Sequence, residues 1–341
     1  MDQPLISIAI PTFDRDKYLE EMLRSLAPQM RRHPGRAEVV ISDNASTDRT
    51  EEVVRSLSRE LGGIRYRRND RNLGVVANYG LAFRLARGKF VCVAGDDDIY
   101  EDYFLDLAIA VIESLDPDLL LFNRSIWNRD MSECILDRLM AIESGLVYGG
   151  IMDLARAHGL ASNLAFISAV LFRRMPAMAA PSTYSLQIGF PYPQIEIYLR
   201  AFNEGRCAVV PQAALRQRQF NGDRPATELR HGIMNGPIGG SIGWIQTFLH
   251  LHRQGLIPFR SLFETRECDP WLTGTMADFI IPNIARAMHY GVLELDHLAC
   301  ILEAMPLLPD GEVKQRLLEC IAVAVDQARL AGQSPRAGLT T

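Results

Sequence analysis

The chain of 341 residues is 48% hydrophobic and 23% charged, so it can build one large domain or two modest ones around a buried core, and global disorder is excluded. Its formal net charge of -5 gives no reason to expect a nucleic-acid partner, because phosphate backbones are held by surplus lysine and arginine. Six cysteines without CxxC pairs favour reduced thiols in a cytoplasmic protein. No apolar run reaches the length of a membrane span, so we expect a soluble protein whose peripheral attachment to a membrane stays open.

Strands and helices are expected to alternate over the first 115 residues. Short β-rich apolar runs predict strands at residues 5–10, 38–41, 64–67 and 90–94. Amphipathic periodicity predicts a helix after Asp14, which would cap it, then helices after Asp48 and at residues 75–86 and 104–115. This alternation is typical of an α/β fold with a mainly parallel sheet covered by helices on both faces.

The pattern loosens in the rest of the chain. Further strands are predicted at residues 118–122, 166–172 and 207–210, the last ending at Pro211, and a helix at 195–202. The segment NGDRPA after residue 220 marks a boundary, so we expect one domain over residues 1–225 and a mostly helical C-terminal region over 226–341. Its helices, predicted at 242–251, 276–289, 293–304 and 312–330, could mediate homo-oligomer formation or membrane docking.

Three polar segments each follow a predicted strand: Pro11-Thr12, Asp43-Asn44 and Asp96 to Asp98. Because parallel sheets bind ligands at the carboxyl ends of their strands, these segments should converge at one edge. Asp96 and Asp98 supply the hard oxygen ligands that Mg²⁺ and Mn²⁺ prefer, and a cation would relieve their repulsion. The alternative is an acidic turn that caps the next helix.

Asp43 has two readings of its own. A fixed carboxylate at a strand end could accept a hydrogen bond from a nucleobase imide or a ribose hydroxyl, or it could close an Asx-turn before the following helix. Asp48 is expected to cap that helix. The ring of Phe13 could stack on a base or simply pack against its neighbours.

Four segments in series carry a family resemblance: IAIPTFDR from Ile8, VVISDNASTD from Val39, NLGVVANYGLAFRLARGKFV from Asn72, and GDDD at 95–98. Together they resemble the nucleotide-binding half of family 2 glycosyltransferases, which have the Rossmann-like GT-A fold. The match covers roughly the first 125 residues. We therefore expect residues 1–125 to bind a nucleotide sugar and residues 126–225 to form the acceptor side.

The resemblance implies a role for each matching residue. Asp96 and Asp98 would form the Asp-X-Asp motif that holds Mn²⁺ or Mg²⁺, and Asp97 would orient the donor sugar or the metal shell. The donor is expected to contact Pro11, Thr12, Phe13, Arg15, Asp43 and Asn72, with Thr12 and Phe13 bordering the nucleobase. The chain departs from many relatives at Ala77, where they have arginine, and at Gly95, where they have an acid.

The catalytic base is assigned to Glu196. An inverting transferase needs a carboxylate to take the proton of the acceptor hydroxyl. Relatives often carry a Glu-Asp pair before a helix ending in Leu-Arg, whereas the matching segment here, FPYPQIEIYLRAF, has Pro193-Gln194. Glu196 is the nearest acid, with Asp223 in reserve. The alternative role of Glu196 is an exposed helix residue.

The sequence thus indicates a metal-dependent, inverting glycosyltransferase. It would move a sugar from a nucleoside diphosphate to a hydroxyl of a saccharide or lipid-linked glycan, in the assembly of bacterial surface polysaccharides such as O-antigen. Such acceptors sit on the cytoplasmic face of the membrane. The alternative, suggested by the missing Glu-Asp pair, is a non-catalytic protein of the same fold that binds nucleotide sugars or acts as a scaffold.

Overall fold

The computed structural model describes residues 3–62, 64–159, 163–180 and 192–219, and beyond these residues 247, 249–257, 302–303, 305–307, 314–315, 318–319 and 321–323. By its internal contacts the chain divides into two compact units, residues 1–189 with 193–224, and residues 190–192 with 225–341. Most of the helices expected after residue 241 lie outside the described residues. None of the described helices is long and apolar enough to cross a membrane.

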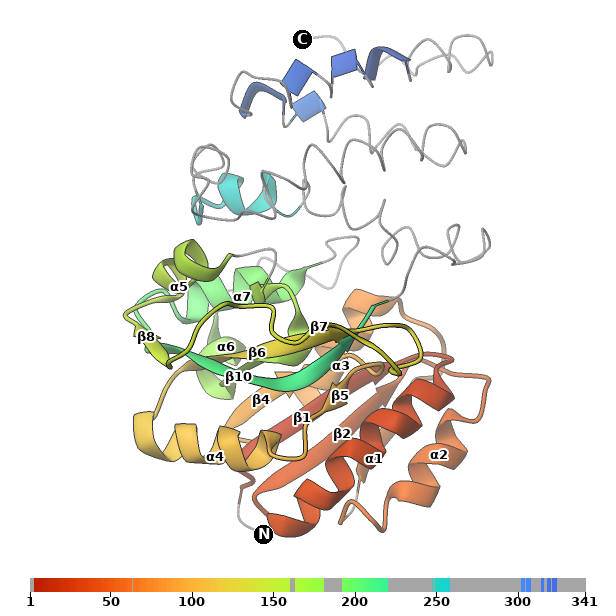
Figure 1. The fold of residues 1–341 in the computed structure, drawn as a ribbon. Coiled ribbons are helices and arrows are strands. Elements are labelled where there is room, and N and C mark those ends of the chain that lie inside the picture. Colours follow the sequence, from red (N-terminus) through yellow and green to blue (C-terminus); the bar gives the residue numbers. More distant parts are fainter. Residues whose placement is uncertain are drawn as a thin grey trace, which may run out of the picture. The chain divides into compact units, whose positions relative to one another are not determined.

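One mixed sheet organises the first unit, as Figure 1 shows. Its strands follow the order β3-β2-β1-β4-β9-β6-β10-β5, with β7 paired to β6 and β8 paired to β10. The pairs β1 with β2, β2 with β3, β1 with β4, and β6 with β10 are parallel. The strands are β1 (Ile6–Thr12), β2 (Ala37–Asp43), β3 (Ile64–Arg68), β4 (Phe90–Val93), β5 (Ile99–Tyr100), β6 (Leu119–Trp127), β7 (Cys134–Leu136), β8 (Leu146–Tyr148), β9 (Val170–Arg173) and β10 (Cys207–Arg218).

The helices that alternate with these strands along the chain cover the sheet. The helices α1 (Asp16–Arg32) and α2 (Thr50–Leu57) pack together, and α1 also meets α4 (Phe104–Leu115). The helix α3 (Val75–Leu85) packs on β1 and β2. From β1 the chain passes through β2 to β3 at the edge of the sheet and then returns to β4 on the other side of β1. Because such crossovers are right-handed, this change of direction puts α3 on the face of the sheet opposite α1. The remaining helices of this unit are α5 (Ile151–His158), α6 (Arg174–Ala179) and α7 (Pro193–Ala201).

The central strand is buried on both faces, as expected for a sheet sandwiched between helices. Ile6, Ile8 and Ile10 on one face of β1, and Ser7 and Ala9 on the other, have no exposed surface. Further along the chain, the ring of Phe172 lies 5.1 Å from that of Tyr198 and 5.6 Å from that of Phe83, measured between centroids. These apolar contacts pack β9 against α7 and α3.

Three local predictions are wrong. The strand β10 does not stop at Pro211; it continues to Arg218, and its register with β6 shifts beside the proline, which has no N–H to donate to the ladder. Asp14 does not cap α1, because its carboxylate accepts the Thr47 N–H at 2.6 Å. Residues 166–172 are only in part a strand, since 167–169 form a 3₁₀ turn before β9.

Candidate functional site

The carboxyl ends of β1, β2 and β4 meet at one edge of the sheet. The Thr12 hydroxyl donates to Asp96 at 2.7 Å, and the Thr12 carbonyl accepts the Asn44 N–H at 2.9 Å. The expected convergence of the three polar segments is confirmed. The chain leaves β1 on one side toward β2 and reaches β4 on the other, so this edge is a topological switch point, the usual ligand site of such sheets.

The Asp96 side of the acidic turn is tied to the start of α1. Asp96 is 5% exposed, and Arg15 Nη1 lies 3.1 Å from its Oδ1 and 2.7 Å from Asp97 Oδ2. Burial by itself would lower the pKa of Arg15, but the two carboxylates raise it above its ordinary value. One guanidinium thus pairs with two of the three acids and balances one of their charges.

Asp98 is held from segments far away in the sequence. It is 3% exposed; its Oδ2 accepts the Ser168 hydroxyl at 2.6 Å, and its Oδ1 accepts the Arg218 N–H at 3.2 Å. Ser168 also accepts the Gly95 N–H at 2.9 Å, so the same side chain fixes both ends of the turn. Neither Ser168 nor Arg218 was identified from the sequence, because no local motif marks them.

Burial favours the neutral form of these acids, and a bound cation would favour their charged form. Burial raises the pKa of Asp98 to about 8, with Asp97 adding to the shift. Burial also raises the pKa of Asp96 to about 6, although Arg15 opposes the shift. Two inward carboxylates with oxygen-only donors fit Mg²⁺ or Mn²⁺. Within the described residues no three His, Cys, Asp or Glu side chains form a complete metal site.

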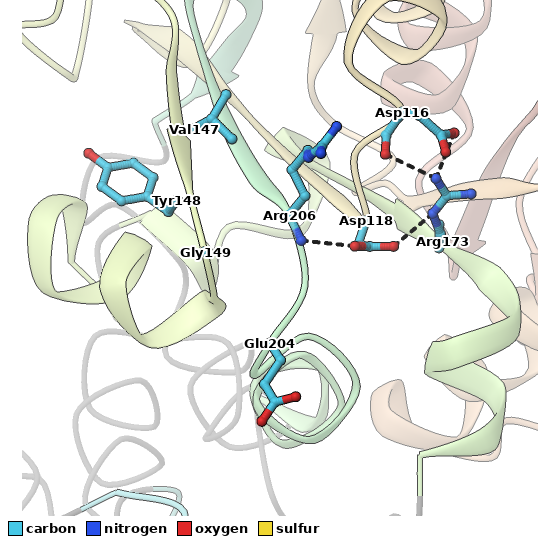
Figure 2. Close-up of a pocket in the computed structure, with 8 residues that line it drawn as sticks. All are labelled: Asp116, Asp118, Val147, Tyr148, Gly149, Arg173, Glu204 and Arg206. Atoms are coloured by element: carbon cyan, nitrogen blue, oxygen red, sulfur yellow. Dashed lines mark hydrogen bonds and ion pairs between the residues drawn. The ribbon is translucent and has the colours of Figure 1, made fainter.

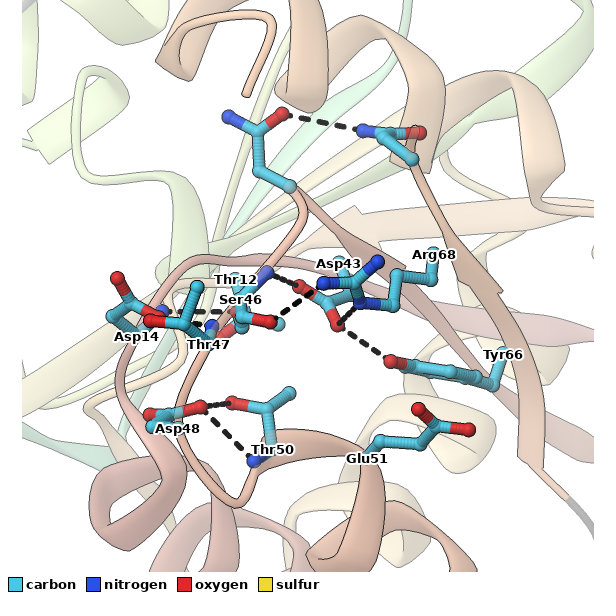
Figure 3. Close-up of polar contacts among 12 residues, drawn as sticks. Thr12, Asp14, Asp43, Ser46, Thr47, Asp48, Thr50, Glu51, Tyr66 and Arg68 are labelled. Atoms are coloured by element: carbon cyan, nitrogen blue, oxygen red, sulfur yellow. Dashed lines mark hydrogen bonds and ion pairs between the residues drawn. The ribbon is translucent and has the colours of Figure 1, made fainter. Parts of the chain in front are cut away.

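Asp43 lies in a second polar cluster, at the end of β2 (Figure 3). It is 1% exposed; its Oδ1 accepts the Ser46 N–H at 2.8 Å and its Oδ2 accepts the Tyr66 hydroxyl at 2.5 Å. Arg68 Nε lies 3.8 Å from Oδ2. Burial and the hydrogen bond to Asp43 raise the pKa of Tyr66 above its ordinary value. The Asp43 carboxylate therefore closes the loop after β2 through the N–H three residues on, one residue further than in an Asx-turn, and a phenol and a guanidinium from β3 flank it.

The loops around Asp43 are braced by further carboxylates, also visible in Figure 3. Asp48 accepts the N–H of Thr50, the first residue of α2, at 3.0 Å, but the N-cap of this helix is Arg49, so Asp48 lies one residue before the position expected for it. Asn72 accepts the Asn44 amide at 2.7 Å and the Gly74 N–H at 2.8 Å. These bonds fix the loop before α3, so Asn72 supports the geometry of this edge.

Three other predicted residues lie at the end of β1 or on the loop after it: Pro11 in the strand, Phe13 and Arg15 in the loop. Phe13 is 41% exposed, so its ring face is available to a ligand, while Pro11 and Arg15 are half-buried. Arg15 reaches the acidic turn as described. This loop thus runs from the Asp43 cluster to Asp96 and Asp97.

Glu196 lies on α7 and is 1% exposed. Its carboxylate accepts a hydrogen bond from Arg200 Nε at 2.8 Å, one turn further along the helix. Gln194, in the place where relatives carry the acidic pair, donates its amide to the Ala165 carbonyl at 2.9 Å. The two polar groups at the start of α7 are thus both bonded within the protein. The reserve candidate Asp223 lies outside the described residues.

A separate hollow of about 550 Å³ opens at the opposite end of the strands (Figure 2). Its walls come from the start of β6 and β10 and the end of β8. Arg173 pairs with Asp116 at 2.6 Å and with Asp118 at 2.8 Å, and the Arg206 N–H donates to Asp118 at 2.8 Å. These charges are paired across the hollow, and it lies away from the edge that carries Asp43 and Asp96.

Comparison with known proteins agrees with the geometry. Residues 7–174 match the family model described as glycosyl transferase family 2. These residues, just under half of the chain, are thus a glycosyl transferase family 2 domain. The resemblance drawn from the four motifs is confirmed, and the matched residues include Thr12, Asp43 and the acidic turn.

The chain is similar to the abequosyltransferase RfbV of Salmonella typhimurium, with 30% identity over 213 residues. That alignment covers 60% of this chain and 62% of RfbV, so it spans less than two thirds of the relative.

Solved structures support the GT-A fold class. TarS 1-349 from S. aureus in complex with UDP-GlcNAc has a TM-score of 0.55 and 16% identity, and the match covers 98% of this chain and 94% of the TarS chain. The mannosyltransferase PcManGT from Pyrobaculum calidifontis, in complex with GDP-Man and Mn²⁺, has a TM-score of 0.50 and 15% identity, covering 98% and 89%. At these identities the likeness shows the fold alone, which confirms the expected α/β architecture.

Proposed function

We propose that the protein is a metal-dependent glycosyltransferase that moves a sugar from a nucleoside diphosphate to a hydroxyl of a saccharide or lipid-linked glycan. The observation that carries this proposal is the pair of buried carboxylates, Asp96 and Asp98, at the same sheet edge as the Asp43 cluster. The named glycosyltransferase relatives support it, and RfbV supports a place in bacterial surface polysaccharide synthesis such as O-antigen assembly.

The donor would lie along the edge from Asp43 to Asp98. Asp43, with Tyr66 and Arg68 beside it, would bind the nucleobase or ribose, and the exposed ring of Phe13 would stack on the base. Pro11, Thr12 and Asn72 would shape this pocket. Arg15 and Asp97 would face the diphosphate or the sugar.

Asp96 and Asp98 would hold Mn²⁺ or Mg²⁺ together with oxygens of the donor. Such a cation, when bound, neutralises a diphosphate and makes it a better leaving group. The PcManGT complex contains Mn²⁺ on a similar fold, which supports this assignment. The described residues offer two buried carboxylates for it, which suits Mg²⁺-type sites that keep substrate phosphates and water in their shell.

The transfer itself is a displacement at the anomeric carbon. The bond between this carbon and the diphosphate oxygen breaks, the acceptor oxygen forms the new bond, and its proton passes to a base. We infer inversion from family membership and retain Glu196 as the proposed base. Its ion pair with Arg200 would have to open or shift toward the acceptor for it to act.

We place the protein in the cytoplasm, with peripheral attachment to the inner face of the membrane where a lipid-linked acceptor would lie. The free cysteines Cys92, Cys134 and Cys207 are consistent with a reducing compartment. We retain residues 126–225 as the acceptor side and 226–341 as a region for membrane docking or homo-oligomer contacts. Cell fractionation and sedimentation of the purified chain test these assignments.

The non-catalytic reading is favoured by one observation: Gln194 replaces a carboxylate, and Glu196 is bonded to Arg200. Turnover decides between the two functions. The purified protein is incubated with UDP-, GDP-, CDP- and dTDP-sugars and a membrane extract as the acceptor source, with MnCl2 or with EDTA. Release of one nucleoside diphosphate in MnCl2 but not in EDTA supports the glycosyltransferase function. Donor binding without release of any nucleoside diphosphate supports the scaffold function.

A further inference from the structure

Arg218 is the last residue of β10, and its side chain is 2% exposed. A guanidinium this buried needs a full set of hydrogen-bond acceptors, because removing a charge from water costs several kcal/mol unless it is compensated. The structure supplies an acceptor for each of its three nitrogens. The identity of these acceptors indicates what the residue does.

Two contacts reach the acidic turn. Arg218 Nε donates to the Asp97 carbonyl at 2.9 Å, and the Arg218 main-chain N–H donates to Asp98 Oδ1 at 3.2 Å. The Arg218 side chain thus holds the carbonyl of the peptide between Asp97 and Asp98, while its main-chain N–H holds the Asp98 carboxylate directly. The peptide plane sets the direction in which the Asp98 carboxylate points.

The other contacts anchor Arg218 itself. Nη1 donates to the Arg129 carbonyl at 2.5 Å, Nη2 pairs with the Glu21 carboxylate on α1, and the guanidinium lies 4.8 Å from the centroid of the Tyr18 ring. Helix α1 and the loop after β6 therefore hold the guanidinium in one orientation. A planar fork with fixed donors is suited to this, whereas the ammonium of lysine is a single point charge.

We propose that Arg218 is a positioning residue that orients Asp98 for the cation and the donor diphosphate. The inference rests on the proposed metal role of Asp98. Groups that orient a metal ligand from outside its first contacts commonly change metal affinity about 10- to 100-fold when they are removed. Arg218 also links the acidic turn to β10, of which it is the last residue.

The test compares the dissociation constant of a nucleoside diphosphate in MnCl2 with that in EDTA, by titration calorimetry. The ligand is whichever of UDP, GDP, CDP and dTDP stabilises the wild-type protein. Arg218→Met and Arg218→Lys should weaken binding at least about tenfold in MnCl2 and leave binding in EDTA unchanged. Glu21→Gln, at a half-exposed position, should weaken binding in MnCl2 several-fold by loosening the anchor.

Arg216→Met is the matched control. Arg216 lies on the same strand, pairs with Glu101 at 2.7 Å and stacks over Trp127 at 4.7 Å, so its loss removes an ion pair and a ring contact that do not involve Asp97 or Asp98. Its binding should equal that of the wild type in both buffers. The inference is overturned if folded Arg218→Met binds the nucleoside diphosphate as tightly as the wild type in MnCl2, or if it loses the same affinity in MnCl2 and in EDTA.

The variants also separate the inference from the proposed function. If Arg218→Met and Arg218→Lys do not fold, Glu21→Gln decides, and wild-type affinity in that variant refutes the positioning role. If the wild-type protein itself shows no Mn²⁺-dependent binding, the proposed function fails and this inference with it. Metal-dependent binding in the wild type together with an unaffected Arg218 variant rejects the inference alone.

Discussion

At the scale of single residues, the acidic turn needs charged carboxylates to bind a cation, but charging them lowers the stability of the folded protein. Asp98 and Asp96 are buried, and burial raises the pKa of both, to about 8 and about 6. The folded state therefore keeps protons on these groups at pH values where the unfolded chain, with the ordinary value of 3.8, has lost them. Their contribution to stability is full below the unfolded pKa and is lost as the pH rises through the folded ones.

The melting temperature of the metal-free protein should therefore fall between pH 4 and pH 8 by several degrees more than that of Asp98→Asn, which keeps a neutral side chain throughout. About 1 kcal/mol corresponds to roughly 2–4 °C for a chain of this size. Circular dichroism melts in EDTA over this pH range measure the difference. Parallel curves for the two proteins would show that Asp98 does not titrate as a buried acid.

Ser168 connects Asp98 to Gly95 and is 1% exposed. Ser168→Ala leaves the Gly95 N–H without its acceptor and Asp98 without its hydroxyl donor. We expect the nucleotide affinity in MnCl2 to fall about tenfold and the free energy of unfolding to fall by about 1–3 kcal/mol.

The control for this substitution is Ser125→Ala, which removes a buried hydroxyl that accepts the Trp127 indole N–H at 2.9 Å. It should lose stability but keep the metal-dependent affinity. Equal affinities for Ser168→Ala and the wild-type protein would mean that the hydroxyl does not orient Asp98.

At the scale of elements, α7 decides whether the protein is a catalyst. Glu196→Gln should preserve donor binding and lower turnover about 10²- to 10⁴-fold, the usual contribution of a general base. Arg200→Met should instead leave a buried carboxylate without this partner and lower the melting temperature. Nucleotide release and thermal melts of both variants make the comparison. Full activity in Glu196→Gln would refute the base assignment and leave the fold unaffected.

The helix α3 is attached to the sheet through Asn78, which is 3% exposed. Its amide donates to the carbonyls of Ser42 at 2.9 Å and Thr12 at 3.3 Å, and its Oδ1 accepts the Ser42 hydroxyl at 2.7 Å. Asn78→Ala should lower the free energy of unfolding by about 2 kcal/mol, because several buried groups lose a partner at once. Urea denaturation measures this. A change below about 0.5 kcal/mol, as at an ordinary surface site, would contradict the attachment.

Sequence reasoning succeeds at this scale where an element has its own periodic pattern. The apolar pattern at 104–115 predicts the helix found there, and the apolar runs before Thr12 and Asp43 predict the two strands that end at these residues. It fails at Pro211, where a register shift lets β10 continue, and at Asp14, whose carboxylate bonds across to Thr47. In both places a partner distant in the sequence overrides the local signal.

At the scale of the whole molecule, topology makes the site. Reversal of the strand order at β1 brings Thr12 against Asp96, 84 positions later in the chain. The sequence predicts this meeting because strand ends in a parallel sheet share an edge. The supports of Asp98 cannot be predicted in that way, since Ser168 and Arg218 come from segments whose order in the sheet, beyond β4, no periodicity reveals.

The measurement that tests the central claim most directly is thermal stabilisation of the wild-type chain and of Asp98→Asn by UDP, GDP, CDP and dTDP, each with and without MnCl2. A ligand that binds only the native state raises the melting temperature in proportion to its affinity. We predict a shift with one nucleotide that requires Mn²⁺ and disappears in Asp98→Asn. No shift with any nucleotide, or the same shift in both proteins, would contradict a metal-dependent donor site at the acidic turn.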